Sequence, residues 1–169
     1  PDGQVFSSDY ETLSDITVRD IRGTVTFSAR SIRTGAVDYS GGAMLTLIRC
    51  SNVTIAGPLF DGNRSGSPQY TGFAHGVQFT TATGDFRSVT TRLNKNIKIL
   101  APTKFKNLGS YRAGDDKFGD GIYLFGVEKF AIQGVEFTDM GRWGIALSDS
   151  NDGDISKCLC TNTMASSVA

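Results

Sequence analysis

The chain has 169 residues, a length that suits one domain, and 39% of them are hydrophobic and 20% charged. Lysine plus arginine and aspartate plus glutamate both number 17, so the chain lacks the basic excess of a general nucleic-acid binder. No apolar run approaches the ~18 residues of a membrane span. The sequence begins Pro1-Asp2-Gly3, without an initiator methionine or a signal peptide, and we expect a fragment of a longer protein.

The first 12 residues form a poorly defined N-terminal end, and short β-branched runs separated by turn residues begin at Leu13. Runs of this kind predict strands. A weak unit of such strands falls at 12–30, and clearer units begin at Leu45, His75, Asp120 and Trp143. The region 13–169 is therefore predicted to be one all-β segment without an amphipathic helix.

The last two units repeat at a constant offset of 23 residues by subtraction. The matching pairs are Ile122 with Ile145, Ile132 with Ile155, and Phe137 with Cys160. Extending this alignment backwards predicts three inward-facing columns: Leu45, Val77, Ile122 and Ile145; Ile55, Ile99, Ile132 and Ile155; and Phe60, Phe105, Phe137 and Cys160. Between Ile99 and Phe105 the spacing is six rather than five, which predicts a one-residue bulge.

Such units cannot close a core alone, but stacked units can, and this favours a parallel β-helix (a solenoid) of about five rungs. A β-sandwich or a propeller is the alternative, but tight hairpin turns between neighbouring runs are few. Long loops are inserted at Asn63–Ala74, Thr80–Arg92 and Leu108–Gly119. Cys158 and Cys160 lie on one face of a predicted strand, where we expect buried thiols rather than a disulfide.

Three stretches carry a family resemblance: Asn52–Asn63, Asp120–Leu124 and Arg142–Leu147. They resemble the right-handed parallel β-helix superfamily of pectin lyases, and within it the bacteriophage tailspike depolymerases most. The resemblance covers roughly residues 43–165. It implies a homotrimeric parent, in a virion tail or secreted, that grips or cuts bacterial surface polysaccharide. Asp120-Gly121 matches the polygalacturonase-type rung start, but Trp143-Gly144 follows one unit later without an Asp pair, so that mechanism is not implied.

The stacking also predicts a candidate site. The residues before the first strand of successive units are His75, Asp120 and Trp143, and neighbouring strands place them about 4.8 Å apart in a surface column. The inserted loops enter from the same side and carry further aromatic, basic and acidic side chains. Candidate substrate-binding residues are His75, Trp143, Arg142, Tyr111, Arg112 and Tyr70.

Glycoside hydrolysis commonly needs two carboxylates about 5–9.5 Å apart. The candidate catalytic residues are Asp120, Asp116, Asp115 and Asp139, with Asp120 paired to Asp115 or Asp116 as the first choice. Each also has a structural interpretation. Asp115 and Asp116 fit a solvated loop tip, Asp120 and Asp139 fit turn residues, and His75 and Trp143 fit packing roles.

The sequence has no Gly-rich phosphate loop, nucleophile elbow or Cys/His metal cluster, so we expect neither a cofactor nor a bound metal. The preferred function is binding and glycosidase-type cleavage of bacterial surface polysaccharide. The alternatives are a non-catalytic receptor-binding or structural β-helix of a tail fibre or adhesin, and a polysaccharide lyase.

Overall fold

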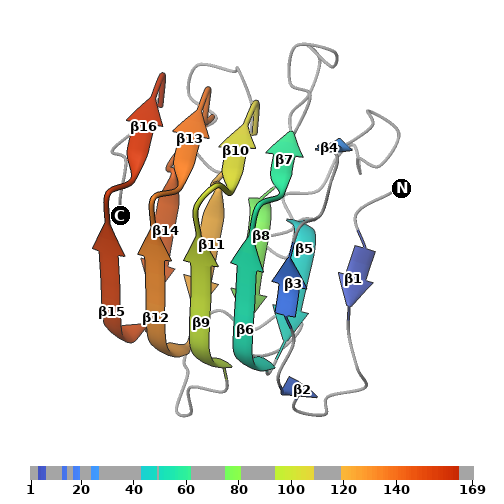
Figure 1. The fold of residues 1–169 in the computed structure, drawn as a ribbon, viewed down its shortest axis with the longest axis vertical. Helices are drawn as coiled ribbons and strands as arrows, with labels where there is room; N and C mark the ends of the chain where they lie inside the picture. Colours follow the sequence, from blue (N-terminus) through green and yellow to red (C-terminus); the bar gives the residue numbers. More distant parts are fainter. Residues whose placement is uncertain are drawn as a thin grey trace.

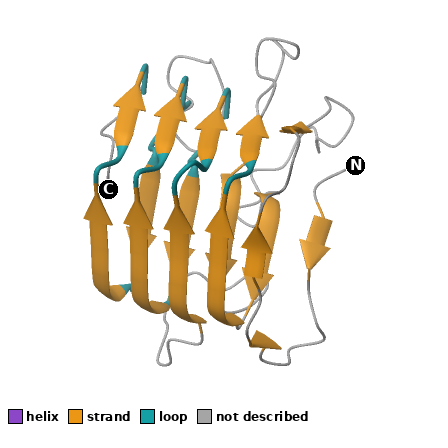
Figure 2. Cartoon of the chain, viewed as in Figure 1, coloured by secondary structure: helices purple, strands orange, loops and turns teal. Residues whose placement is uncertain are grey.

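The computed structural model describes residues 4–6, 13–14, 17–19, 24–26, 43–48, 50–61, 75–80, 94–108 and 119–163. These residues form three sheets of parallel strands, and no described residue is helical (Figures 1 and 2). Because the described residues form no helix, none of them belongs to a helix long and apolar enough to cross a membrane.

Each sheet collects strands from successive stretches of the chain, one from each stretch except that β2 and β3 both join the second sheet. The first sheet contains β1 (Gln4–Phe6), β5 (Ala43–Ile48), β8 (His75–Thr80), β11 (Ile122–Phe125) and β14 (Ile145–Ser148). The second sheet contains β2 (Leu13–Ser14), β3 (Thr17–Arg19), β6 (Cys50–Ala56), β9 (Asn94–Leu100), β12 (Val127–Gln133) and β15 (Asn151–Ser156). The third sheet contains β4 (Thr24–Thr26), β7 (Leu59–Asp61), β10 (Lys104–Lys106), β13 (Glu136–Thr138) and β16 (Leu159–Thr161).

Along the chain, the strands visit the first, second and third sheets in the same cyclic order (Figure 1). All the strand pairs among the described residues are parallel, as in β8 with β11 and β11 with β14. This arrangement is compatible with a parallel β-helix. The stretch 1–12, in which no element was predicted, contains β1, and the weak unit at 12–30 contributes β2, β3 and β4.

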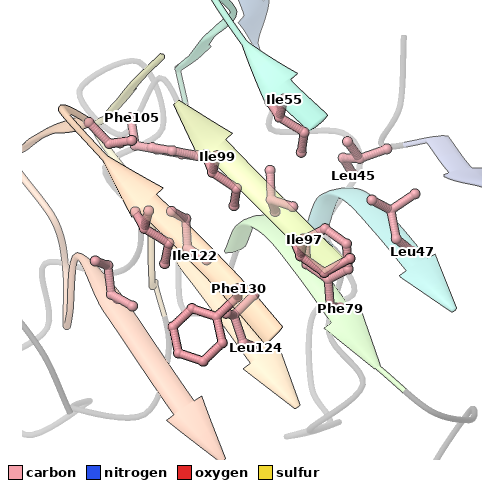
Figure 3. Packing of buried hydrophobic residues seen from close by; sticks show 14 of the residues in the cluster. Leu45, Leu47, Ile55, Phe79, Ile97, Ile99, Phe105, Ile122, Leu124 and Phe130 are labelled. Carbon is pink, nitrogen blue, oxygen red and sulfur yellow. The ribbon is translucent and has the colours of Figure 1, made fainter. Parts of the chain in front are cut away.

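The strand register confirms the three inward columns predicted from the repeat. Val77 pairs with both Leu45 and Ile122, and Ile122 pairs with Ile145. The columns through Ile99 and through Phe105 are formed in the same way in the second and third sheets. Parallel strands lie about 4.8 Å apart, so equivalent positions stack directly and bury one another's apolar surface. Figure 3 shows the inner side chains meeting between the sheets.

An aromatic stack runs through the third sheet. The ring centroids of Phe60 and Phe105 are 4.8 Å apart, and those of Phe105 and Phe137 are 5.3 Å apart, with nearly parallel planes. Gly76 and Gly121 make room for this stack. An added Cβ would lie 2.3 Å from the Phe105 ring at Gly76, and 2.5 Å from the Phe137 ring at Gly121. The glycines that open the predicted units are therefore needed for close packing.

The predicted bulge between Ile99 and Phe105 is wrong. β9 pairs without interruption from Ile97 to Leu100, and the extra residue lies in the turn that follows, at Ala101–Thr103. The strands do have an irregular position, but it lies earlier in the second sheet, where Asn52, Asn96, Lys129 and Asp152 all have positive φ. Figure 1 shows β6, β9, β12 and β15 curving at this end.

Candidate functional site

His75, Asp120 and Trp143 follow one another across the strands of the first sheet, as the stacking predicts. The backbone N–H of Gly76 donates to the carbonyl oxygen of Asp120 over 3.0 Å, and the N–H of Gly121 donates to that of Trp143 over 3.0 Å. His75 begins β8, and Asp120 and Trp143 come just before β11 and β14. This column and the adjacent Arg142 form a compact group, which we call the Asp120 cluster.

The centre of the Asp120 cluster is a carboxylate held by a guanidinium. Nε of Arg142 donates to Oδ1 of Asp120 over 2.8 Å, and Nη2 donates to Oδ2 over 2.5 Å. The Asp120 side chain is 0% exposed, and that of Arg142 is 17% exposed. Two parallel bonds of this kind fix the orientation of the guanidinium as well as its distance. Arg142 is thus held by a buried carboxylate, while part of its own side chain is exposed at the surface.

His75 approaches the same carboxylate from the neighbouring strand. Its Nδ1 lies 3.1 Å from Oδ2 of Asp120, within ion-pair distance. This nitrogen is buried and the pair lacks hydrogen-bond geometry. The imidazole also stacks on the ring of Tyr123, with centroids 5.2 Å apart. The only histidine of the chain is therefore packed between a carboxylate and an aromatic ring.

The contacts of Asp120 determine its protonation. Burial acts to raise its pKa, but the contacts with His75 and Arg142 outweigh burial, and the net effect is a pKa below the ordinary value. A general acid at neutral pH needs a raised pKa. Asp120 is instead an ionised, enclosed carboxylate, which suits it to anchoring Arg142.

Arg142 and Trp143 form the accessible edge of the cluster. The guanidinium carbon lies 3.9 Å from the centroid of the Trp143 ring, a cation–π contact. Trp143 and Tyr123 are both partly exposed. Burial and then the charge of Asp120 raise the pKa of Tyr123, so it is an un-ionised phenol at neutral pH. The edge thus combines one fixed cation with two aromatic side chains.

Asp139 lies apart from this edge, in a turn that recurs after β10, β13 and β16. Asn107, Asp139 and Asn162 have φ values of 56°, 57° and 53° at this turn. Nδ2 of Asn162 donates to Oδ1 of Asp139 over 3.1 Å, and the Asp139 N–H donates to the carbonyl oxygen of Thr161. These contacts match the interpretation of Asp139 as a turn residue. It is partly exposed, so its carboxylate is accessible in part.

The remaining candidates lie outside the described residues. They are Asp115, Asp116, Tyr111, Arg112 and Tyr70. Within the described part of the chain, no group of three or more histidine, cysteine, aspartate or glutamate side chains is placed to hold a metal ion.

A second polar region, on the outward face of the second sheet, was missed by the sequence interpretation. It is a hollow of about 490 Å³ lined by Asn52, Thr54, Asn96, Lys98, Lys129 and Asp152, among others. Asn52 and Asn96 stand at equivalent positions of two units, and asparagine tolerates positive φ. This recurrence of asparagine is the sequence signal that could have indicated the region. Lys129 occupies the equivalent position of the next unit, but a lysine there does not indicate positive φ.

Comparison with protein-family models, with curated proteins and with solved structures gives no match.

Proposed function

We propose that this chain is a segment of a right-handed parallel β-helix of about five rungs that binds bacterial surface polysaccharide, as part of a tailspike-like or secreted protein with a homotrimeric parent. The cyclic visiting order of the three sheets and the matching registers of the inward columns support the β-helix. The Asp120 cluster supports the ligand class.

The observation that carries the proposal is the Arg142–Trp143 pair. Polysaccharide recognition needs flat apolar surfaces for sugar rings and fixed polar groups for their hydroxyl or carboxylate substituents. Trp143 and Tyr123 supply the aromatic surfaces, and Arg142 supplies donors already oriented by Asp120. A preorganised guanidinium loses little side-chain entropy on binding, which favours affinity.

Binding without cleavage is the form of the function that the described residues favour. Asp120 is fully buried and its two oxygens are both held by Arg142, so it is poorly placed to protonate or attack a glycosidic bond. Glycoside hydrolysis, the second candidate, would use Asp139, which is partly exposed, with Asp115 or Asp116 from the inserted loop.

The test is binding to a panel of bacterial surface polysaccharides by affinity electrophoresis, with release of reducing ends measured in parallel. Trp143→Ala is expected to weaken binding about thirty-fold, because truncating a central aromatic contact costs about 2 kcal/mol. Leu159→Ala is the matched control, since Leu159 is a 57% exposed apolar residue of the third sheet. Its binding is expected to equal that of the wild type, with both variants folded by circular dichroism.

The same assay separates the two forms of the function. Binding without new reducing ends supports recognition alone. Reducing-end release that is lost in Asp139→Asn or Asp116→Asn supports hydrolysis. Undiminished binding by Trp143→Ala would contradict the assignment of the Asp120 cluster, and absence of binding across the panel would contradict the function itself.

A further inference from the structure

His75 has a buried ring nitrogen whose hydrogen bonding the proposed function leaves unexplained. Its side chain is 5% exposed, and its Nδ1 has no hydrogen-bond partner although it lies 3.1 Å from Oδ2 of Asp120. Buried polar atoms are nearly always bonded, so an exception needs a physical reason. A bare Nδ1 beside a carboxylate oxygen brings two acceptors together, whereas a protonated Nδ1 can donate to that oxygen. The contact therefore favours a proton on Nδ1.

The oxygen that His75 approaches already accepts a hydrogen bond from Arg142. Nη2 of Arg142 donates to Oδ2 of Asp120, while Nε donates to Oδ1. Oδ1 also accepts from the backbone N–H of Trp143 over 3.4 Å. The carboxylate thus orients the guanidinium and holds the backbone of the residue on whose ring the guanidinium lies. A second donor to Oδ2 would therefore act on both members of the Arg142–Trp143 pair.

Three neighbouring parts of the first sheet surround the imidazole. In β5, His75 pairs with Ala43, which carries no charge. Before β11 it approaches the Asp120 carboxylate, and within β11 it stacks on the Tyr123 ring, which the Asp149 carboxylate influences in turn. Among the described residues, the titratable or charged groups around His75 are therefore two carboxylates, one phenol and the guanidinium that binds Asp120.

Neither of the two nearest titratable neighbours changes charge between pH 5 and 8. Burial opposes the ionisation of Asp120, but its contacts with His75 and Arg142 outweigh burial and hold its pKa below the ordinary value, so it stays ionised. Burial and then the charge of Asp120 raise the pKa of Tyr123, so this phenol stays neutral. Histidine is the side-chain type whose charge ordinarily changes in this range. A change of charge beside Oδ2 of Asp120 therefore comes from His75.

We propose that His75 is a positioning residue for the Arg142–Trp143 pair, and that protonation of its imidazole loosens the hold of Asp120 on Arg142. With a proton taken up from the solvent, Nδ1–H of the cationic ring donates to Oδ2, which then shares its charge between two cations. The bond from Nη2 of Arg142 weakens, and the bond from Nε to Oδ1 remains. The effect on polysaccharide binding rests on the proposed function, whereas the positioning of Arg142 rests on the geometry.

The first test needs no polysaccharide, because the chain contains one histidine and one tryptophan. The ring signals of His75 in proton NMR give its titration directly. The emission of Trp143 reports the guanidinium, whose carbon lies 3.9 Å from the centroid of the indole ring. From pH 8 to pH 5, we expect the emission of Trp143 to change with the same midpoint as the His75 signals.

Two substitutions of His75 show whether this change comes from its proton. His75→Gln keeps a polar side chain, and His75→Phe keeps a ring to stack on Tyr123, but neither side chain titrates. Both are expected to remove the change in emission, and Leu159→Ala, at an exposed position of the third sheet, is expected to retain it. Constant wild-type emission from pH 8 to pH 5, or a change that persists in both His75 variants, would overturn the inference.

The second test measures the affinity for a polysaccharide that the wild type binds in the electrophoresis panel. The wild-type affinity is expected to fall about five-fold from pH 8 to pH 5, which corresponds to partial loss of one charge-assisted hydrogen bond. His75→Gln is expected to bind with one affinity over this range. Because two linked ligands affect each other's binding equally, saturating polysaccharide is expected to move the NMR titration of His75 to lower pH. This last measurement uses only the wild type and does not depend on the folding of a variant.

The outcomes separate this inference from the proposed function. Emission of Trp143 that follows His75, with binding that weakens in acid, supports both. Wild-type binding of equal affinity at pH 8 and pH 5 overturns the inference and leaves the proposed function standing. Absence of binding across the panel contradicts the proposed function, and the emission of Trp143 then decides whether His75 positions Arg142.

Discussion

Replacing Gly121 by alanine is expected to destabilise the fold by about 3 kcal/mol, because overpacking a close-packed core forces side chains and backbone apart. The new Cβ would lie 2.5 Å from Cδ1 of Phe137 and 2.7 Å from the carbonyl oxygen of Gly144. The second contact is with backbone just before β14, and this carbonyl oxygen accepts a hydrogen bond from the N–H of Ile122, so it cannot move without breaking that bond. Urea unfolding followed by circular dichroism measures the loss.

Gly144→Ala is the comparison variant, because the added Cβ makes longer contacts there than at Gly121. Its added Cβ would meet Phe137 and Cys160 side-chain atoms at 3.0–3.2 Å and no backbone among its nearest neighbours. Small displacements of these side chains relieve such contacts, so we expect a loss of about 1 kcal/mol. If Gly121→Ala proved as stable as the wild type, or Gly144→Ala the more damaging of the two, the described stacking of the glycines on the phenylalanines would be wrong.

Asp120→Asn is expected to cost about 2–3 kcal/mol of unfolding free energy. Removing one partner of a buried ion pair leaves the other charge without compensation, at a typical cost of about 3–5 kcal/mol. We expect a cost at or just below the bottom of this range because the Arg142 side chain is 17% exposed and retains contact with water. Glu136→Gln is the control: it removes an exposed partner of Lys104 and is expected to change stability by less than about 1 kcal/mol.

For the same variant, we expect the loss of stability relative to the wild type to depend on pH in a defined direction. The pKa of Asp120 is lower in the folded protein than in the unfolded chain, where a value near 3.9 is ordinary. The stability that Asp120 contributes is therefore fully present above about pH 4 and is lost as the pH falls through the folded-state pKa. The stability difference between wild type and Asp120→Asn is expected to shrink as the pH falls below about 4. A constant difference down to pH 2 would contradict the ionised state of Asp120.

Much of the strand register follows from the sequence because parallel strands stack equivalent positions. The 23-residue offset placed Ile122 beside Ile145 and Phe137 beside Cys160, and both pairs are present. The same logic placed Asp120 next to Trp143, and hence near Arg142. Where the guanidinium points does not follow from a repeat. The sequence predicts Arg142 as a substrate-binding residue, and its pairing with Asp120 is visible only in the structure.

Other features depend on backbone conformations that side-chain patterns signal weakly. Asparagine at positions 52 and 96 is compatible with positive φ, but Lys129, with φ of 63°, is a residue type that seldom adopts it. The sequence alone therefore did not show that these residues form one row along the hollow on the second sheet. The extra residue between Ile99 and Phe105 could equally belong to a strand or to a turn, because the spacing gives the number of residues between two positions and not their conformation.

The most direct test of the proposed function uses Trp143, the only tryptophan of the chain, as an intrinsic probe. Tryptophan fluorescence is followed while a polysaccharide that binds in the electrophoresis assay is titrated into the wild-type protein. Stacking of a sugar ring on the indole removes water from it, so we expect a saturable blue shift whose midpoint equals the dissociation constant from titration calorimetry. A bound polysaccharide that leaves the emission of Trp143 unchanged would contradict the account.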